Sequence, residues 1–124
     1  MTFGMNNIVS PTPKFKRALK PLSKKYKTLK ETIQQLEQNL IANPYLGESY
    51  GKGIYKVRIS DKSKGKGKSG GFRVLYYHLE VTQQGIKMLL LDIFDKSEVS
   101  TIKKNDAVAQ LDYILEEYLN NLKV

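Results

Sequence analysis

Two groups of basic side chains in this sequence have the types and the spacing that phosphate chemistry requires. The first group comes from three segments in the middle of the chain and consists of Lys56, Arg58, Arg73 and Lys96. The second group repeats at every second position of one glycine-rich segment and consists of Lys62, Lys64, Lys66 and Lys68. A planar guanidinium binds two phosphate oxygens at once, and a lysine-rich loop binds a phosphodiester backbone whatever its base sequence. The two groups predict a phosphate site and an adjacent loop that binds a phosphodiester backbone.

Other chemistries find less support among the residues. The chain has no cysteine and a single histidine, His78, which excludes disulfides, thiolate catalysis and a two-histidine mechanism. Asp92 and Asp95 flank the end of an apolar segment, but without a histidine partner they are weak candidates for metal ligands. A phosphate loop is disfavoured because Lys62 stands where that pattern needs a glycine, and because a strand is expected to follow instead of a helix. We therefore expect neither a metal nor a cofactor.

The charge of the chain indicates the class of its partners. Lysine and arginine number 21 against 12 acidic residues, which gives a formal net charge of +9. Eight basic residues lie in residues 1–30 and eight in residues 52–73, whereas the rest of the chain is slightly acidic. This imbalance favours a polyanionic partner such as nucleic acid, an anionic membrane or an acidic protein. Two alternatives remain: the first block forms a solvated helix face, or the site cations pair with nearby carboxylates, namely Asp61, Glu80, Asp92 and Glu98.

The length of 124 residues predicts one domain, residues 1–124, of which residues 1–7 are expected to be flexible. The N-terminal residues do not have the pattern of a signal peptide. The most apolar run, residues 88–91, ends at Asp92 and is far shorter than the roughly 20 residues that span a bilayer. We expect a cytoplasmic protein with no membrane partner.

Apolar residues at helical spacing predict two helices in the N-terminal third of the chain. Thr12 is expected to cap the first, with Pro13 at its first position, and Pro21 predicts that this helix is short or interrupted. Ser23 is expected to cap the second helix, which should end just before Pro44.

The pattern then changes to the alternation of strands. Strands are expected at residues 54–59, 72–78 and 86–94, after a loop at residues 45–53, and a last helix is expected from about residue 105. Short links between the strands indicate an antiparallel meander. The predicted class is α+β, with N-terminal helices packed on a mainly antiparallel sheet and a C-terminal helix.

This arrangement would bring the first group of cations together. Alternation places Lys56 and Arg58 on one face of their strand and Arg73 on one face of the next, while Lys96 follows the third strand. Neighbouring strands lie about 5 Å apart, so these cations can converge on one sheet face. A face that carries so many charges must meet solvent or an anion.

Three motifs, in this order, resemble the RelE/ParE toxin superfamily: YKVRI at residues 55–59, GFRVLYY at residues 71–77 and LLDIFDKSE at residues 90–98. The GKGKSGG segment before Arg73 is most similar to the HigB-like branch of that superfamily. The resemblance implies a microbial RNase-like (RelE-like) fold and the toxin of a type II toxin–antitoxin system. Such a toxin is a metal-independent endoribonuclease that cuts mRNA in the ribosomal A site and inhibits translation. It also implies a cognate antitoxin, expected to be a helix-turn-helix DNA-binding protein.

The resemblance implies a role for each cation. Lys56 or Arg58 would assist deprotonation of the RNA 2′-hydroxyl, Arg73 would stabilise charge on the phosphorane, and Lys96 would neutralise or protonate the leaving 5′-oxygen. The family often has a tyrosine a few residues later, where this chain has residues 99–102 and no tyrosine. Two other functions stay open: a ParE-like toxin that poisons gyrase, and an RNA-binding module without catalysis.

Overall fold

A computed structural model describes residues 6–64, 71–96 and 104–122 of the chain. Its elements follow in the order β1 (Ile8–Pro11), α1 (Pro13–Lys25), α2 (Leu29–Ala42), β2 (Glu48–Gly51), β3 (Ile54–Ile59), β4 (Phe72–Thr82), β5 (Gly85–Asp95) and α3 (Lys104–Leu122). The α+β class and the N-terminal helices on a mainly antiparallel sheet are confirmed. No helix in these ranges is long and apolar enough to cross a membrane.

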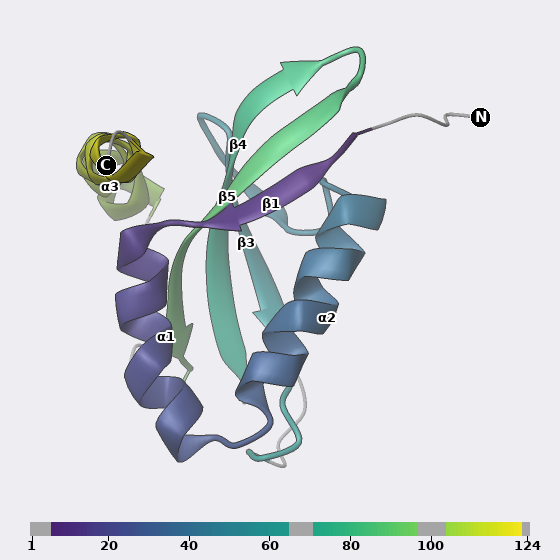
Figure 1. The fold of residues 1–124 in the computed structure, drawn as a ribbon, viewed down its shortest axis with the longest axis vertical. Coiled ribbons are helices and arrows are strands. Elements are labelled where there is room, and N and C mark those ends of the chain that lie inside the picture. Colours follow the sequence, from purple (N-terminus) through teal and green to yellow (C-terminus); the bar gives the residue numbers. More distant parts are fainter. Residues whose placement is uncertain (1–5, 65–70, 97–103, 123–124) are drawn as a thin grey trace.

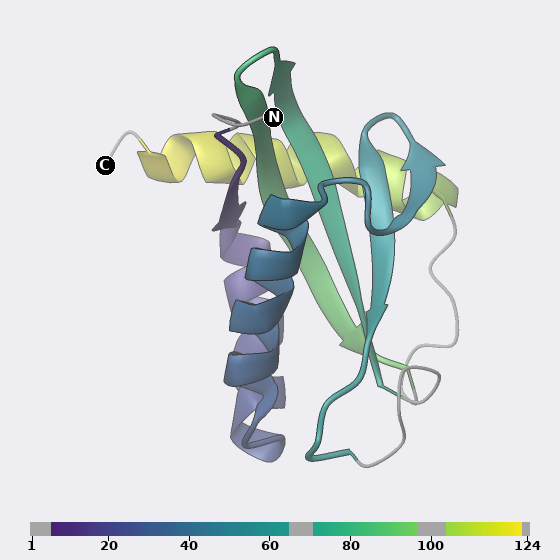
Figure 2. The same cartoon turned by 90° about the vertical axis from the view of Figure 1, so that its right-hand side faces the viewer.

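The five strands form one sheet in the order β1-β5-β4-β3-β2. The pairs β2–β3, β3–β4 and β4–β5 are antiparallel, and β1 pairs with β5 in parallel. Helices α1 and α2 run along the sheet together, and α3 crosses the strands separately (Figures 1 and 2). One face of the sheet therefore packs against α1 and α2, and the other packs against α3.

The two faces have separate hydrophobic cores. Helices α1 and α2 bury the face that carries Phe72, Val74 and Tyr76, and α3 packs through Leu111 and Ile114 against the opposite face. A bulge in β5 opposite Leu75/Tyr76 keeps both faces apolar along an almost continuously hydrophobic strand. Strand β5 lies inside the sheet, as its apolar sequence predicts.

The boundary between the first two helices differs from the prediction. Helix α1 begins as expected, because the Thr12 hydroxyl accepts a hydrogen bond from Phe15 N, but it continues through Pro21 to Lys25. Burial of Phe15 and Leu22 on either side of the proline outweighs the missing hydrogen bond, which costs about 3 kcal/mol. The prediction of a cap at Ser23 was therefore wrong, and α2 begins after Thr28.

Two short strands were not predicted. Strand β1 was too short for its alternation to stand out, and β2 lies in a segment rich in glycine that was expected to be loop. Each has only four residues and exists because an exposed strand edge offers it backbone partners. Asn6 and Asn7, expected to be flexible, donate hydrogen bonds to Gln84 O and Ile41 O.

Candidate functional site

Arg58 and Arg73 face each other across the sheet. They are direct partners in the antiparallel register of β3 and β4, and both lie on the face that α3 covers in part. Facing residues of antiparallel strands have Cα atoms about 5 Å apart. The fold thus places the two arginines on neighbouring strands at one end of this face, which we call the basic face.

The two arginines have different environments. Arg73 is only 5% exposed and donates from Nη1 to Phe72 O over 3.3 Å, whereas Arg58 is exposed. Burial lowers the pKa of Arg73, and the positive charge of Arg58 lowers it further. Both effects disfavour the charged guanidinium, so an anion bound here would relieve unfavourable electrostatic energy.

Lys56 lies on the same face, two residues before Arg58 on β3. Its ammonium sits 5.2 Å from the centre of the Tyr50 ring, and the opposite residue on β4 is Leu75. Cation–π contact holds the ammonium without neutralising it. Within the described ranges, neither Lys56 nor Arg58 pairs with a carboxylate.

Lys96 follows β5 at the same end of the sheet. Its backbone N–H donates to the carbonyl oxygen of Gly71, two residues before Arg73, over 3.1 Å. This hydrogen bond joins the end of β5 to the start of β4. The fold therefore brings all four residues of the first predicted group to one region of the sheet.

The second predicted group is divided. Lys62 is exposed, but the Lys64 ammonium lies 2.5 Å from Asp95 Oδ1 and only 7% of its side chain is exposed. Lys64 was expected in an open loop, but the structure pairs it with Asp95 at the end of β5. Lys66 and Lys68 lie outside the described residues.

The carboxylates that could have neutralised the site cations bind elsewhere. Asp92 pairs with Lys14 at 2.9 Å, Glu80 pairs with Lys87, and Asp61 accepts hydrogen bonds from hydroxyl groups. Asp92 and Asp95, weak metal candidates in the sequence, each bind a lysine in the structure. Glu98 lies outside the described residues.

His78 is on the other sheet face and is 8% exposed. Its ring stacks on Tyr55 with 4.3 Å between centroids, and its Nε2 lies 2.8 Å from Pro44 O. These contacts give His78 a structural role far from the two arginines.

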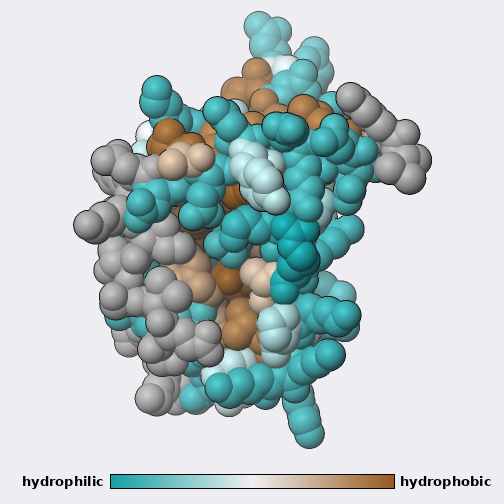
Figure 3. Space-filling view, turned by 90° about the vertical axis from the view of Figure 1, so that its left-hand side faces the viewer, coloured by the Kyte–Doolittle hydropathy of each residue, from teal (hydrophilic) through white to brown (hydrophobic). Residues whose placement is uncertain are grey.

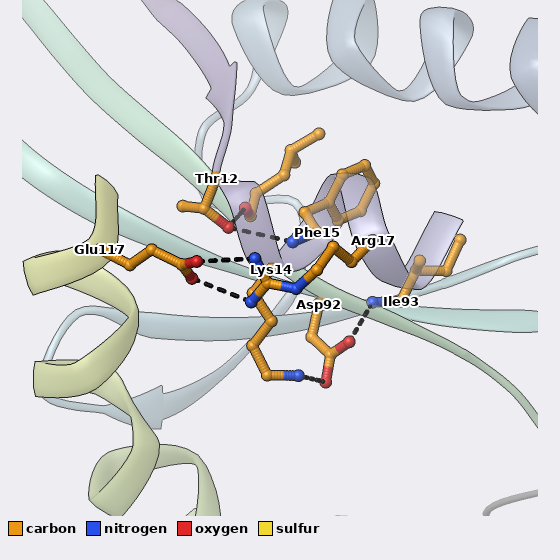
Figure 4. A network of polar contacts seen from close by, with 8 residues as sticks. Thr12, Lys14, Phe15, Arg17, Asp92, Ile93 and Glu117 are labelled. Atoms are coloured by element: carbon orange, nitrogen blue, oxygen red, sulfur yellow. Dashed lines mark hydrogen bonds and ion pairs between the residues drawn. The ribbon is translucent and has the colours of Figure 1, made fainter. Parts of the chain in front are cut away.

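Helices α1 and α3 frame the basic face. Figure 3 views the molecule from the side of α3 and shows hydrophobic surface in a recess between hydrophilic side chains. Figure 4 shows the polar contacts at the α1 border, where Arg17 binds both carboxylate oxygens of Glu117 at 2.7 and 2.9 Å and Lys14 binds Asp92. The Arg17–Glu117 pair ties α3 to α1 and fixes that border.

An open cleft of about 670 Å³ lies beside the basic face, between α2 and the edge of β3. Its apolar lining includes Leu36, Val57 and Ile59, and its basic lining consists of Lys56, Arg58 and Lys62. Strand β2 pairs with β3 only as far as the Glu48–Lys56 partners, so the rest of this strand edge is open.

The carbonyl oxygens of β3 lie close to glycines on either side of the strand, and these contacts show which way each carbonyl points. A Cβ on Gly47 would lie 2.7 Å from Lys56 O, and a Cβ on Gly71 would lie 2.0 Å from Ile59 O. Lys56 O therefore points toward β2 and Ile59 O toward β4. Since the direction alternates along a strand, the N–H and C=O of Arg58 face the open edge.

The sequence did not reveal the role of Tyr26 or Asp95. Tyr26 had only been part of the apolar stripe of a helix, yet its hydroxyl donates to Asp95 Oδ2 over 3.0 Å. One signal was available: alternation places Asp95, two residues after Ile93, on the buried face of its strand, where a carboxylate needs a partner.

The described residues form an α+β protein whose mainly antiparallel sheet pairs a buried arginine with a second arginine, with Lys56 on the same face. The family model of the RelE toxin of the RelE/RelB toxin–antitoxin system matches residues 9–121 of the chain. The chain belongs to this family and is the toxin of a toxin–antitoxin system, with an antitoxin as its partner.

A solved structure agrees with this fold. The free state of a doubly substituted E. coli toxin RelE matches 94% of this chain and 98% of its own length, with a TM-score of 0.50 and 14% sequence identity. At this identity the match concerns the fold alone.

Proposed function

We propose that this toxin is a metal-independent endoribonuclease that cuts mRNA on the translating ribosome and so inhibits translation in the cytoplasm. The observation that carries the proposal is the facing pair Arg58–Arg73, in which one arginine is 5% exposed. Each guanidinium offers parallel N–H donors that match two oxygens of one phosphate. A phosphodiester therefore fits a site that two neighbouring arginines provide.

The proposed reaction begins with attack of an RNA 2′-oxygen on the neighbouring phosphorus. The 2′-hydroxyl proton passes to the amine of Lys56 or to a water molecule, and Lys56 or Arg58 stabilises the oxygen that forms. Arg73 binds the phosphorane oxygens, where two parallel N–H donors fit the developing charge. The bond from phosphorus to the 5′-oxygen then breaks, Lys96 neutralises or protonates that oxygen, and the products are a 2′,3′-cyclic phosphate and a 5′-hydroxyl.

The ribosome supplies the alignment that this mechanism needs. In-line attack requires the 2′-oxygen, the phosphorus and the 5′-oxygen to be held nearly collinear, and correct placement is worth several orders of magnitude in rate. A free single strand samples this geometry rarely. Lys62, together with Lys66 and Lys68, is proposed to bind flanking phosphates, which adds affinity that falls with salt.

The proposal is tested by expressing the toxin without its antitoxin and mapping mRNA 5′ ends on translating ribosomes. New ends within codons in the A site are expected, and Arg73→Ala should abolish them while thermal unfolding stays cooperative. Growth arrest with intact mRNA and a DNA-damage response would instead support a gyrase poison. Absence of toxicity, with RNA binding retained, would support a module that only binds RNA.

The cleft between α2 and β3 offers a place for the antitoxin. Its basic lining favours an acidic segment, and its apolar lining together with the open Arg58 backbone favours an extended one. We propose that such a segment, from an antitoxin that also carries a helix-turn-helix DNA-binding domain, lies along the β3 edge next to Arg58. Slower amide hydrogen exchange at Arg58 in the complex would support this placement.

A further inference from the structure

A buried ion pair lies directly behind the basic face. The Lys64 ammonium is 2.5 Å from Asp95 Oδ1, and the side chains are 7% and 0% exposed. The Tyr26 hydroxyl donates to Asp95 Oδ2 over 3.0 Å. The same ammonium lies 5.1 Å from the ring centres of both Tyr26 and Phe72.

These contacts argue that Lys64 does not bind RNA directly. A lysine gains affinity for RNA when its exposed charge replaces the counterions of a phosphate. The Lys64 charge is already neutralised by a carboxylate and enclosed by two aromatic rings. Binding a phosphate would require breaking a buried pair and exposing Asp95 without its cation, which is strongly unfavourable.

The position of the pair relates it to the site. Asp95 is the register partner of Phe72, and the next pair along the sheet is Arg73 with Phe94. Phe72 belongs to the core under α1 and α2, whereas Phe94 belongs to the core under α3. The ion pair is therefore on the reverse side of the strand ends that carry Arg73 and Lys96.

A second cluster holds the segment before Lys64. Asp61 accepts hydrogen bonds from the hydroxyls of Thr28 and Thr32 and from Ser63 N. Lys64 N then donates to Asp61 O over 3.0 Å. The segment that leaves β3 is thus fixed to the start of α2 before Lys64 reaches Asp95.

We propose that Lys64 and Asp95 are a positioning pair that fixes the ends of β3, β4 and β5 and thereby holds Arg73 and Lys96 in their places for RNA cleavage. This inference rests on the proposed function. It assigns Lys64 a role through Asp95 and separates it from the exposed Lys62, two residues earlier in the same segment. Asp95 has the same positioning role as Lys64. A carboxylate there could not itself attract RNA.

The test compares single-turnover cleavage of mRNA on programmed ribosomes for Lys64→Met, Asp95→Asn and the double variant K64M/D95N. Each protein gives a rate at saturation, a half-saturating concentration and a salt dependence. Lys62→Met serves as the contrast for an exposed loop lysine. Lys87→Met, which breaks the exposed Lys87–Glu80 pair, serves as the control for loss of an ion pair in general.

For a positioning pair, Lys64→Met and Asp95→Asn both lower the saturating rate by about tenfold or more, since misplaced groups lose their alignment with the substrate. The salt slope stays that of the native protein. The double variant recovers at least about fivefold over Lys64→Met, because neither charge is left buried alone. Lys62→Met instead raises the half-saturating concentration and reduces the salt slope by about 0.7.

The opposite pattern would overturn the inference. If Lys64 contacts RNA, Lys64→Met reduces the salt slope as Lys62→Met does, and Asp95→Asn, which frees the ammonium, tightens binding. If Lys64→Met does not fold, the saturating rate and the salt slope of Asp95→Asn are compared with those of the double variant instead.

A readout without RNA separates this inference from the proposed function. The Lys96 amide, bonded to Gly71 O, should exchange with solvent about tenfold faster in Lys64→Met and remain unchanged in Lys87→Met. If the native protein never cleaves mRNA but Lys64→Met still speeds exchange of the Lys96 amide, the proposed function is refuted and the positioning role of the pair is supported. Unchanged exchange at Lys96 in all variants would refute the pair.

Discussion

The facing arginines predict that one of them lowers stability while it serves function. We consider Arg58→Gln, which removes one charge, keeps a polar side chain of moderate length and leaves Arg73 in place. Because the charge of Arg58 lowers the pKa of Arg73, its removal also removes a repulsion in the folded protein. We expect Arg58→Gln to raise the free energy of unfolding and to reduce cleavage.

The size of the effect follows from Coulomb's law. Facing residues of antiparallel strands have Cβ atoms about 5 Å apart. Two unit charges at about that spacing repel by about 0.8 kcal/mol in the dielectric of water and by about 3.3 kcal/mol at an effective dielectric of 20. Arg58 is exposed, so solvent screens it and the lower value applies. We expect a gain of about 0.5–1 kcal/mol at low salt that largely disappears in about 1 M salt, where the Debye length is near 3 Å.

The assay is urea unfolding at low and high salt, together with cleavage on programmed ribosomes. Cleavage should fall by about tenfold or more as one phosphate contact is lost. Lys87→Gln is the control, because Lys87 pairs with Glu80 and its removal should not stabilise the protein. Loss of stability in Arg58→Gln, or a gain that does not depend on salt, would refute repulsion between the two arginines as its cause.

Two further predictions concern buried polar groups. Burial alone would raise the pKa of Asp61, but hydrogen bonds from Thr32, Thr28 and Ser63 outweigh it, so the pKa lies below its usual value. Asp61→Ala should cost about 2–3 kcal/mol at pH 7 in urea unfolding. The difference from the native protein should begin to shrink below about pH 4, where the carboxylate of the unfolded chain binds a proton, and should be lost once the pH falls below the lowered pKa of the folded protein. A constant difference down to about pH 2 would contradict this. Burial raises the pKa of Tyr76 to about 12, and its hydroxyl donates to Pro44 O and accepts from Gly47 N, so Tyr76→Phe should cost about 1–2 kcal/mol in the same assay without changing cleavage.

The sequence by itself determined most of the elements and the faces of the strands. A period of two was enough to place Lys56 and Arg58 on one face of β3, because successive side chains of a strand must point to opposite sides. The register of β3 with β4 then put Arg73 on the same face. Order and spacing of three motifs were enough to indicate the superfamily. Pro21 misled the prediction, because the packing that keeps α1 continuous comes from residues far away in the chain.

Only the tertiary structure decided which charges are available. Lys62 and Lys64 have the same residue type and the same glycine-rich surroundings in the sequence, yet one is exposed and the other is buried against Asp95. That difference depends on where the end of β5 and Tyr26 lie relative to the segment, which local pattern does not encode. The depth of Arg73 has the same origin, since burial is a property of what packs around a residue and its type alone does not fix it.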